Sequence, residues 1–351
     1  TLISPIIIFQ LNIDFSKFYL DFLHICKLII VILLLAIPYF FAGVALSYLL
    51  KVNNQDLPRL YMSDLIGAAT GTFVILIVMN LIGTPKAFTI INIIIPLLLL
   101  ILKNKPKDLI LPLTTIFLII IIIPFSEKLF ELPRKDRGEI LFTHWDAMGK
   151  IRVVEYNEYT RGIRIDNAAQ TSVYRFNGDF RNTQFNFDIN ISYLINKFNN
   201  CKFLSLGAGG GTDVLHALQE GAIEVHAVEV IPYINYLLKD GELADYTGNV
   251  YSDPRVKVIT EDARTYVRRF NNKFDIILAL SSNTYAALAS GAFALAENYL
   301  FTTEAVIDYW NSLSENGYLV FEHHFYIPRL VSNVIDALRQ IGVNQPNLYF
   351  A

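Results

Sequence analysis

The chain has few cysteines, few charged residues and no concentrated run of basic residues. Its two cysteines, Cys26 and Cys201, lie far apart and form no CxxC pair, which argues against a disulfide framework or a cysteine-ligated zinc site. The formal net charge is −3, whereas nucleic-acid binding needs a clustered basic face. We therefore expect no nucleic-acid partner. The first residue is Thr1 rather than Met, no signal peptide is recognisable, and the sequence is consistent with a piece of a longer precursor.

The apolar residues are concentrated in the first third of the chain. Hydrophobic residues make up 53% of the sequence and charged residues 17%, and the mean hydropathy is +0.40. These averages are high for a soluble protein and indicate one very apolar part beside an ordinary one. Charges return at normal density after Phe125, so we predict a membrane region over residues 1–126.

Four stretches within this region approach the roughly 20 apolar residues that a membrane span needs. They are Phe22–Leu50, Tyr61–Ile82, Ala87–Leu102 and Leu109–Phe125. One such stretch could be a buried core helix, but four in succession cannot easily be packed inside so small a soluble protein. The sequence therefore predicts an integral, multi-pass membrane protein in contact with the lipid bilayer.

The second part of the chain has the pattern of an α/β protein. Lys150–Glu155 and Gly162–Asp166 are typical of a β-hairpin. Short apolar runs separated by helical stretches then predict a parallel sheet covered on both faces; they are Phe203–Leu206, Val225–Val230, Val256–Thr260, Asp275–Leu280 and Gly317–Phe321. We predict a linker and β-hairpin subdomain over residues 127–195 and a Rossmann-like domain over residues 196–351.

A glycine cluster, Gly207–Gly211, follows the first of these runs and precedes the predicted helix Asp213–Glu220. Glycine there lets backbone N–H groups come close to a ligand, although a flexible turn is the alternative. Glu229 follows about 20 residues later, where such domains place an acid on ribose hydroxyls. Asp262 ends the next strand at the same sheet edge, and its alternative interpretation is a helix cap. Together these features predict a nucleoside-binding cleft.

The order of elements resembles the spermidine/spermine synthase family, and more closely its membrane-bound bacterial branch. Arg59–Ala68 resembles a span of that branch, Gly149–Glu155 and Ile165–Gln170 its hairpins, and Ala296–Thr302 the segment after the active-site loop. The resemblance implies a class I methyltransferase-like fold with S-adenosylmethionine or decarboxylated S-adenosylmethionine as cofactor. The cofactor-binding residues that it implies are Gln170, Gly207, Gly209, Gly211, Glu229, Asp262 and Ala263.

The chain departs from this family where the reaction would take place. Spermidine synthases carry two acids in the loop after the fourth strand, and Leu280 and Asn283 replace them here; Gly210 replaces a further aspartate. A cationic polyamine needs carboxylates to bind it and a base to accept its proton. Aminopropyl transfer to putrescine is therefore not expected. Methyl transfer requires less of the protein, because positioning a nucleophile beside the sulfonium of the cofactor supplies much of the rate enhancement.

Polar residues in the same loop are the catalytic candidates. Ser281, Ser282, Asn283 and Tyr285 either line a pocket for a neutral or apolar acceptor or form a capped loop. His323 and His324 are adjacent on a strand and point to opposite faces, so we expect no metal site.

Two functions follow from these residues. The first is a membrane-bound transferase whose unidentified acceptor lies near the bilayer. The second is a catalytically inactive subunit with a structural or assembly function in a membrane complex. A transporter with a regulatory domain is disfavoured because the spans are few and carry no charge near mid-membrane. Basic residues flank the spans on both sides; because the implied cofactor is cytosolic, we predict a cytoplasmic C-terminal domain in a bacterial-type plasma membrane.

Overall fold

A computed structural model describes most of the chain. The described residues are 2–13, 21–102, 106–131, 138–167, 169–181, 185, 187, 190–270, 273–279, 299–322 and 327–350. Contacts divide the chain into two compact units, residues 1–136 with 143–150 and residues 137–142 with 151–351. The three-part division predicted from the sequence stays a prediction.

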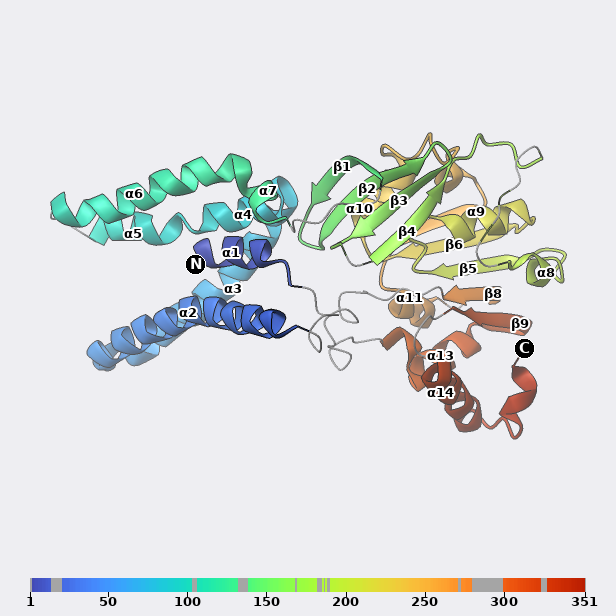
Figure 1. Cartoon of the computed structure of the whole chain (residues 1–351). Helices are drawn as coiled ribbons and strands as arrows, with labels where there is room; N and C mark the ends of the chain where they lie inside the picture. Colours follow the sequence, from blue (N-terminus) through green and yellow to red (C-terminus); the bar gives the residue numbers. More distant parts are fainter. Residues whose placement is uncertain are drawn as a thin grey trace. The chain divides into compact units, whose positions relative to one another are not determined.

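The first unit is helical (Figure 1). Its helices are α1 (Ile3–Leu11), α2 (Phe22–Val52), η2 (Asn54–Asp56), α3 (Leu57–Ile82), α4 (Thr84–Ile91), α5 (Ile94–Leu102), α6 (Pro106–Ile122), η3 (Ile123–Phe125) and α7 (Ser126–Leu129). The Asp21 carboxylate accepts the Leu23 N–H at the start of α2, which satisfies a free amide of the first turn. Gly83, with φ +84°, ends α3, and Pro85 opens α4, where its missing N–H costs nothing.

Four helical segments of this unit are long and apolar enough to cross a membrane. They are Phe22–Val52, Asn54–Ile82, Thr84–Leu102 and Pro106–Leu129, and each contains one predicted span. In the first two segments none of the most apolar stretch is buried inside the protein. Side chains of this composition are stable in that state when lipid surrounds them.

A four-stranded sheet, called the small sheet below, follows the helices. Its strands, in spatial order, are β1 (Glu139–Trp145), β2 (Lys150–Asn157), β3 (Thr160–Ile165) and β4 (Ala169–Tyr174). The β2–β3 and β3–β4 pairs are antiparallel. Ile151 lies opposite Ile165 between β2 and β3, and Ile163 lies opposite Thr171 between β3 and β4. The predicted hairpin is confirmed, and β1 and β4 extend it on both sides.

A five-stranded parallel sheet follows, in the order β7-β6-β5-β8-β9. Its strands are β5 (Lys202–Leu206), β6 (Glu224–Glu229), β7 (Val256–Thr260), β8 (Phe274–Ala279) and β9 (Leu313–Phe321). The predicted α/β fold is confirmed. The prediction that the last strand starts at Gly317 was wrong, because β9 already pairs from Leu313 and its ladder with β8 is irregular between the two positions. The first part of β9 is not recognisable as an apolar run because residues Ser314–Asn316 are polar.

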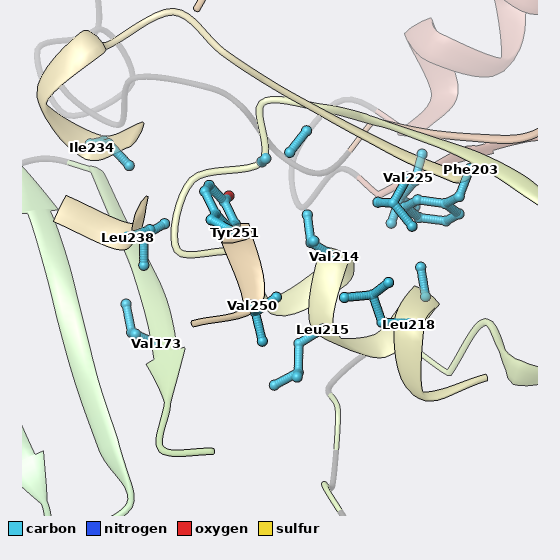
Figure 2. Packing of buried hydrophobic residues seen from close by; sticks show 14 of the residues in the cluster. Val173, Phe203, Val214, Leu215, Leu218, Val225, Ile234, Leu238, Val250 and Tyr251 are labelled. Carbon is cyan, nitrogen blue, oxygen red and sulfur yellow. The ribbon is translucent and has the colours of Figure 1, made fainter. Parts of the chain in front are cut away.

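Helices cover both faces of the five-stranded sheet (Figure 1). The helices of this unit are α8 (Ser192–Ile195), α9 (Thr212–Gln219), α10 (Pro232–Lys239), η4 (Val250–Ser252), α11 (Ala263–Arg269), η5 (Tyr299–Phe301), α13 (Thr303–Asn311), α14 (Ile327–Gln340) and η6 (Pro346–Tyr349). One hydrophobic core joins α9 and α10 to one face of the five-stranded sheet and to the four-stranded small sheet. A second core joins α11, α13 and α14 to the opposite face of the five-stranded sheet. In the first core Tyr251 has Val214 on one side and Leu238 on the other (Figure 2). The small sheet therefore shares its core with the helices beside the glycine loop.

We predict that Phe203→Ala destabilises the second unit by about 3–5 kcal/mol, because the removed ring leaves a cavity. Phe203 is fully buried in the first core, whereas Ile223, just before β6, is 45% exposed. Thermal unfolding of the full chain in detergent measures the effect, with Ile223→Ala as the matched control. Equal melting temperatures for the two variants would contradict this placement of the core.

Candidate functional site

The glycine loop, residues 207–211, lies where the strand order of the large sheet reverses. β5 has β6 on one side and β8 on the other, and open α/β sheets bind ligands outside the carboxyl ends of the strands at such a point. The loop leaves β5 and enters α9, whose N-cap residue is Gly211 with φ +76°. The fold thus places the predicted glycine loop at the usual ligand edge.

Every backbone N–H of the loop already donates a hydrogen bond within the protein. Those of Gly207 and Ala208 donate to Val228 O, at 2.9 and 3.0 Å, and that of Gly211 donates to Ala208 O at 2.8 Å. The N–H of Gly209 donates to Glu229 Oε2 at 3.1 Å, and that of Gly210 to Thr171 Oγ1 at 2.9 Å. A phosphate-binding loop instead leaves such amides directed at the anion. This loop is therefore not built to hold a phosphate.

Neighbouring protein atoms explain why three of these positions are glycine. A Cβ at Gly210 would lie 2.1 Å from Ser172 O, and one at Gly209 would lie 3.0 Å from Thr171 Oγ1. A Cβ at Gly211 would lie 2.8 Å from the ring of Tyr251. The close neighbours at these positions are β4 and η4, so contacts within the protein, and not only the expected approach of a ligand, require glycine there.

Glu229 faces the glycine loop from the end of β6. Its side chain accepts the N–H groups of Gly209 and, at 2.9 Å, Ile231. Only 7% of the residue is exposed, and this burial raises the pKa of the carboxyl group. Each carboxylate oxygen has a second lone pair, so the acid can still accept a ribose hydroxyl.

Asp262 and Ala263 follow β7, the neighbour of β6, at the same edge; Thr260 of β7 lies opposite Glu229. Asp262 is the N-cap of α11 and accepts the Thr265 N–H at 2.8 Å, so the helix cap considered from the sequence is present. Ala263 is the first residue of α11 and is buried. Their assignment as adenine contacts stays a prediction.

Gln170 lies on β4 and is exposed. Side chains alternate between the faces of a strand, so Gln170 points away from the face on which Thr171 meets the glycine loop. Its assignment as a nucleoside contact stays a prediction.

Three residues of this region were not singled out from the sequence. Thr171 bonds the loop, Asp213 accepts a short hydrogen bond from Ser205 and another from Val214 N–H, and Tyr251 packs against Gly211. Burial raises the pKa of Asp213 to about 6 and that of Tyr251 well above its usual range. The Tyr251 hydroxyl has no hydrogen-bond partner among the described residues. Of these, only Asp213, in the first turn after the glycines, stands close to a recognised motif.

Other predicted residues fall outside the part of the chain that the structure describes. These are Leu280, Ser281, Ser282, Asn283, Tyr285, His323 and His324. Within the described residues, no three His, Cys, Asp or Glu side chains gather as a metal site would require.

The chain is similar in sequence to known transferases. No family model matches it. Curated polyamine aminopropyltransferases from three strains of Clostridium perfringens are 31% identical to it over 121 residues, and the match covers 34% of this chain and 39% of each enzyme. The resemblance to the spermidine synthase family is confirmed. It supports a synthase-like transferase in general, while membership of the membrane-bound branch stays a prediction.

Two solved spermidine synthases also align with the chain, at 18% sequence identity. One is in complex with the transition-state analogue AdoDATO. Its alignment covers 57% of this chain and 63% of the synthase chain, with a TM-score of 0.42. The other, from Thermotoga maritima, covers 57% and 64%, with a TM-score of 0.43.

We predict that the Asp213→Asn variant becomes increasingly more stable than the natural chain as the pH rises from 4 to 7. The pKa of an unfolded aspartate is about 3.9, and that of Asp213 is raised to about 6. The folded state therefore holds a proton that the unfolded chain releases, and the natural chain loses up to about 3 kcal/mol through this window. Asparagine can accept the Val214 N–H through Oδ1 and donate to Ser205 Oγ through Nδ2, and it carries no charge.

Melting temperatures of both proteins, measured in detergent between pH 4.5 and 7.5, give the difference. A difference that does not change with pH would show that Asp213 is not buried as described.

Proposed function

We propose that this chain is a membrane-anchored, synthase-like transferase that binds S-adenosylmethionine or its decarboxylated form and does not synthesise polyamines. The observation that carries the proposal is the pairing of Glu229 with Gly209 at the switch point of the sheet. It brings the predicted ribose acid and the predicted glycine loop to one place. The relatives named polyamine aminopropyltransferase support the transferase class.

The loop favours a nucleoside over a nucleotide. Because all five amides of residues 207–211 are bonded within the protein, a pyrophosphate would have to break those bonds to bind as it does in dinucleotide sites. A nucleoside joined to a sulfonium needs a ribose acceptor and an adenine contact instead. Glu229 fits the role of the ribose acceptor, and Asp262 with Ala263 fits that of the adenine contact.

The replacement of both loop acids by Leu280 and Asn283 argues for an acceptor other than a polyamine, since a cationic amine needs carboxylates. A lipid, quinone, neutral amine or membrane protein near the bilayer fits better. The cofactor would supply the transferred group. Ser281, Ser282, Asn283 and Tyr285 would orient the acceptor, which is the main demand of such a transfer.

One observation favours the alternative, an inactive subunit that assembles a membrane complex. Glu229 and Asp262 already form backbone hydrogen bonds that stabilise the fold. Either acid could therefore be present without any ligand. Binding of a nucleoside distinguishes the two functions only in part, because an inactive subunit could retain it, so transfer must be measured as well.

We expect calorimetric titration of the full chain in detergent to give a Kd on the order of micromolar, about −8 kcal/mol, for S-adenosylmethionine or its decarboxylated analogue, and no binding of NAD. Preference for the decarboxylated compound would return aminopropyl transfer to consideration. Failure of S-adenosylmethionine, its decarboxylated analogue and 5′-methylthioadenosine to bind would leave the assembly function.

Asp262 variants separate its adenine contact from its helix cap. Asp262→Ser keeps a capping oxygen but removes the carboxylate, so we expect an unchanged melting temperature and about tenfold weaker nucleoside binding. Asp262→Ala should lose both, with the cap costing about 1 kcal/mol. Full affinity in Asp262→Ser would assign the acid to capping alone.

We also propose that the four apolar segments cross the membrane and leave the C-terminal unit in the cytoplasm. Fusions after Ala351 test this in a bacterial host. We expect a fused green fluorescent protein to fluoresce and a fused alkaline phosphatase to be inactive, since the latter folds only in an oxidising compartment. The reverse pattern would overturn the orientation.

A further inference from the structure

β4 offers the glycine loop two hydrogen-bonding atoms. Thr171 Oγ1 accepts the Gly210 N–H at 2.9 Å, and Ser172 O accepts the Thr212 hydroxyl at 2.9 Å. Within the described residues β4 pairs with β3 on one side and with no strand on the other. An edge strand has unpaired backbone groups, and here Thr212, the first residue of α9, bonds one of them.

The fit between strand and loop leaves no space for a side chain. A Cβ at Gly210 would lie 2.1 Å from Ser172 O, far inside any real contact. The neighbouring position is also tight, with Thr171 Oγ1 at 3.0 Å from a Cβ on Gly209. The loop conformation is therefore fixed by β4 as well as by its own sheet.

Thr171 acts on the amide next to the one that Glu229 holds. The Gly209 N–H is bonded to Glu229 and the Gly210 N–H to Thr171, so the two side chains fix successive peptide units of one bend. Loss of the Thr171 acceptor leaves the Gly210 amide without its partner, and turning that amide toward water turns the Gly209–Gly210 peptide. The Glu229 contact would then move with it.

We propose that Thr171 is a positioning residue of the nucleoside site, which sets cofactor affinity through the glycine loop without touching the cofactor. The proposal rests on the proposed function, because it takes Glu229 and the loop as the nucleoside edge. In this proposal the small sheet contributes directly to the site through Thr171, which lies on the face of β4 opposite to that of Gln170.

Three variants of the full chain in detergent test it, with 5′-methylthioadenosine as the calorimetric probe. Thr171→Val keeps the shape and removes the acceptor, so we expect about tenfold weaker binding. Thr171→Ser restores the oxygen and should bind within about twofold of the natural chain. Thr160→Val is the matched control, since Thr160 pairs with Tyr174 and not with the loop, and it should bind normally.

Hydrogen exchange of the peptide that covers residues 207–212 provides a measurement that needs no ligand. Faster exchange there in Thr171→Val, and not in Thr160→Val, supports the part of the proposal in which Thr171 fixes the glycine loop. If the natural chain then binds no nucleoside, the proposed function fails, and the effect of Thr171 on affinity fails with it. Unchanged exchange in Thr171→Val overturns the proposal. Normal probe affinity in Thr171→Val, in a natural chain that binds the probe, overturns it as well.

Discussion

A buried carboxylate determines how the centre of the second unit is arranged. Glu229 is almost fully enclosed, and an acid in such a place is tolerated only when hydrogen bonds replace the lost water. The amides of Gly209 and Ile231 provide those bonds. Because one amide lies in the loop after β5 and the other follows β6, the acid joins the ends of two neighbouring strands. The bend after β5 depends on that link.

The same link explains the chemistry that the bend can support. Amides that already have partners within the protein cannot also hold an anion without losing those partners. The carboxylate of Glu229 can instead accept hydroxyl groups through its remaining lone pairs, which is the chemistry that the proposed function requires. The bend differs from the anion cradles that glycine-rich loops form elsewhere at helix N-termini.

The sequence was sufficient for the features that depend on local pattern. β5, β6, β7 and β8 are short apolar runs, which periodicity detects, and the four long apolar segments stand out by composition alone. Glu229 could be found because its distance from the glycines follows from one strand-helix-strand unit. These features need no knowledge of which distant segments meet.

The contacts of β4 could not be found in this way. Thr171 and Gly210 are 39 residues apart, and nothing in the pattern of a half-buried strand indicates which of its side chains meets a loop of another sheet. The role of Asp262 could not be predicted from the sequence either, because a helix cap and a ligand contact can both use an aspartate at the start of a helix. The polar start of β9 was missed because strand pairing, and not apolarity, defines it there.

The crowding at Gly210 also constrains which substitutions this chain can accept. Any side chain at residue 210, including the aspartate that the resemblance to spermidine synthases would place there, would collide with the Ser172 carbonyl. An acid at this position would require β4 to move away, and that movement alone would break the hydrogen bonds that Thr171 and Ser172 accept. Each change is harmful without the other. A stable variant with an acid at residue 210 would therefore need compensating substitutions in β4 at the same time.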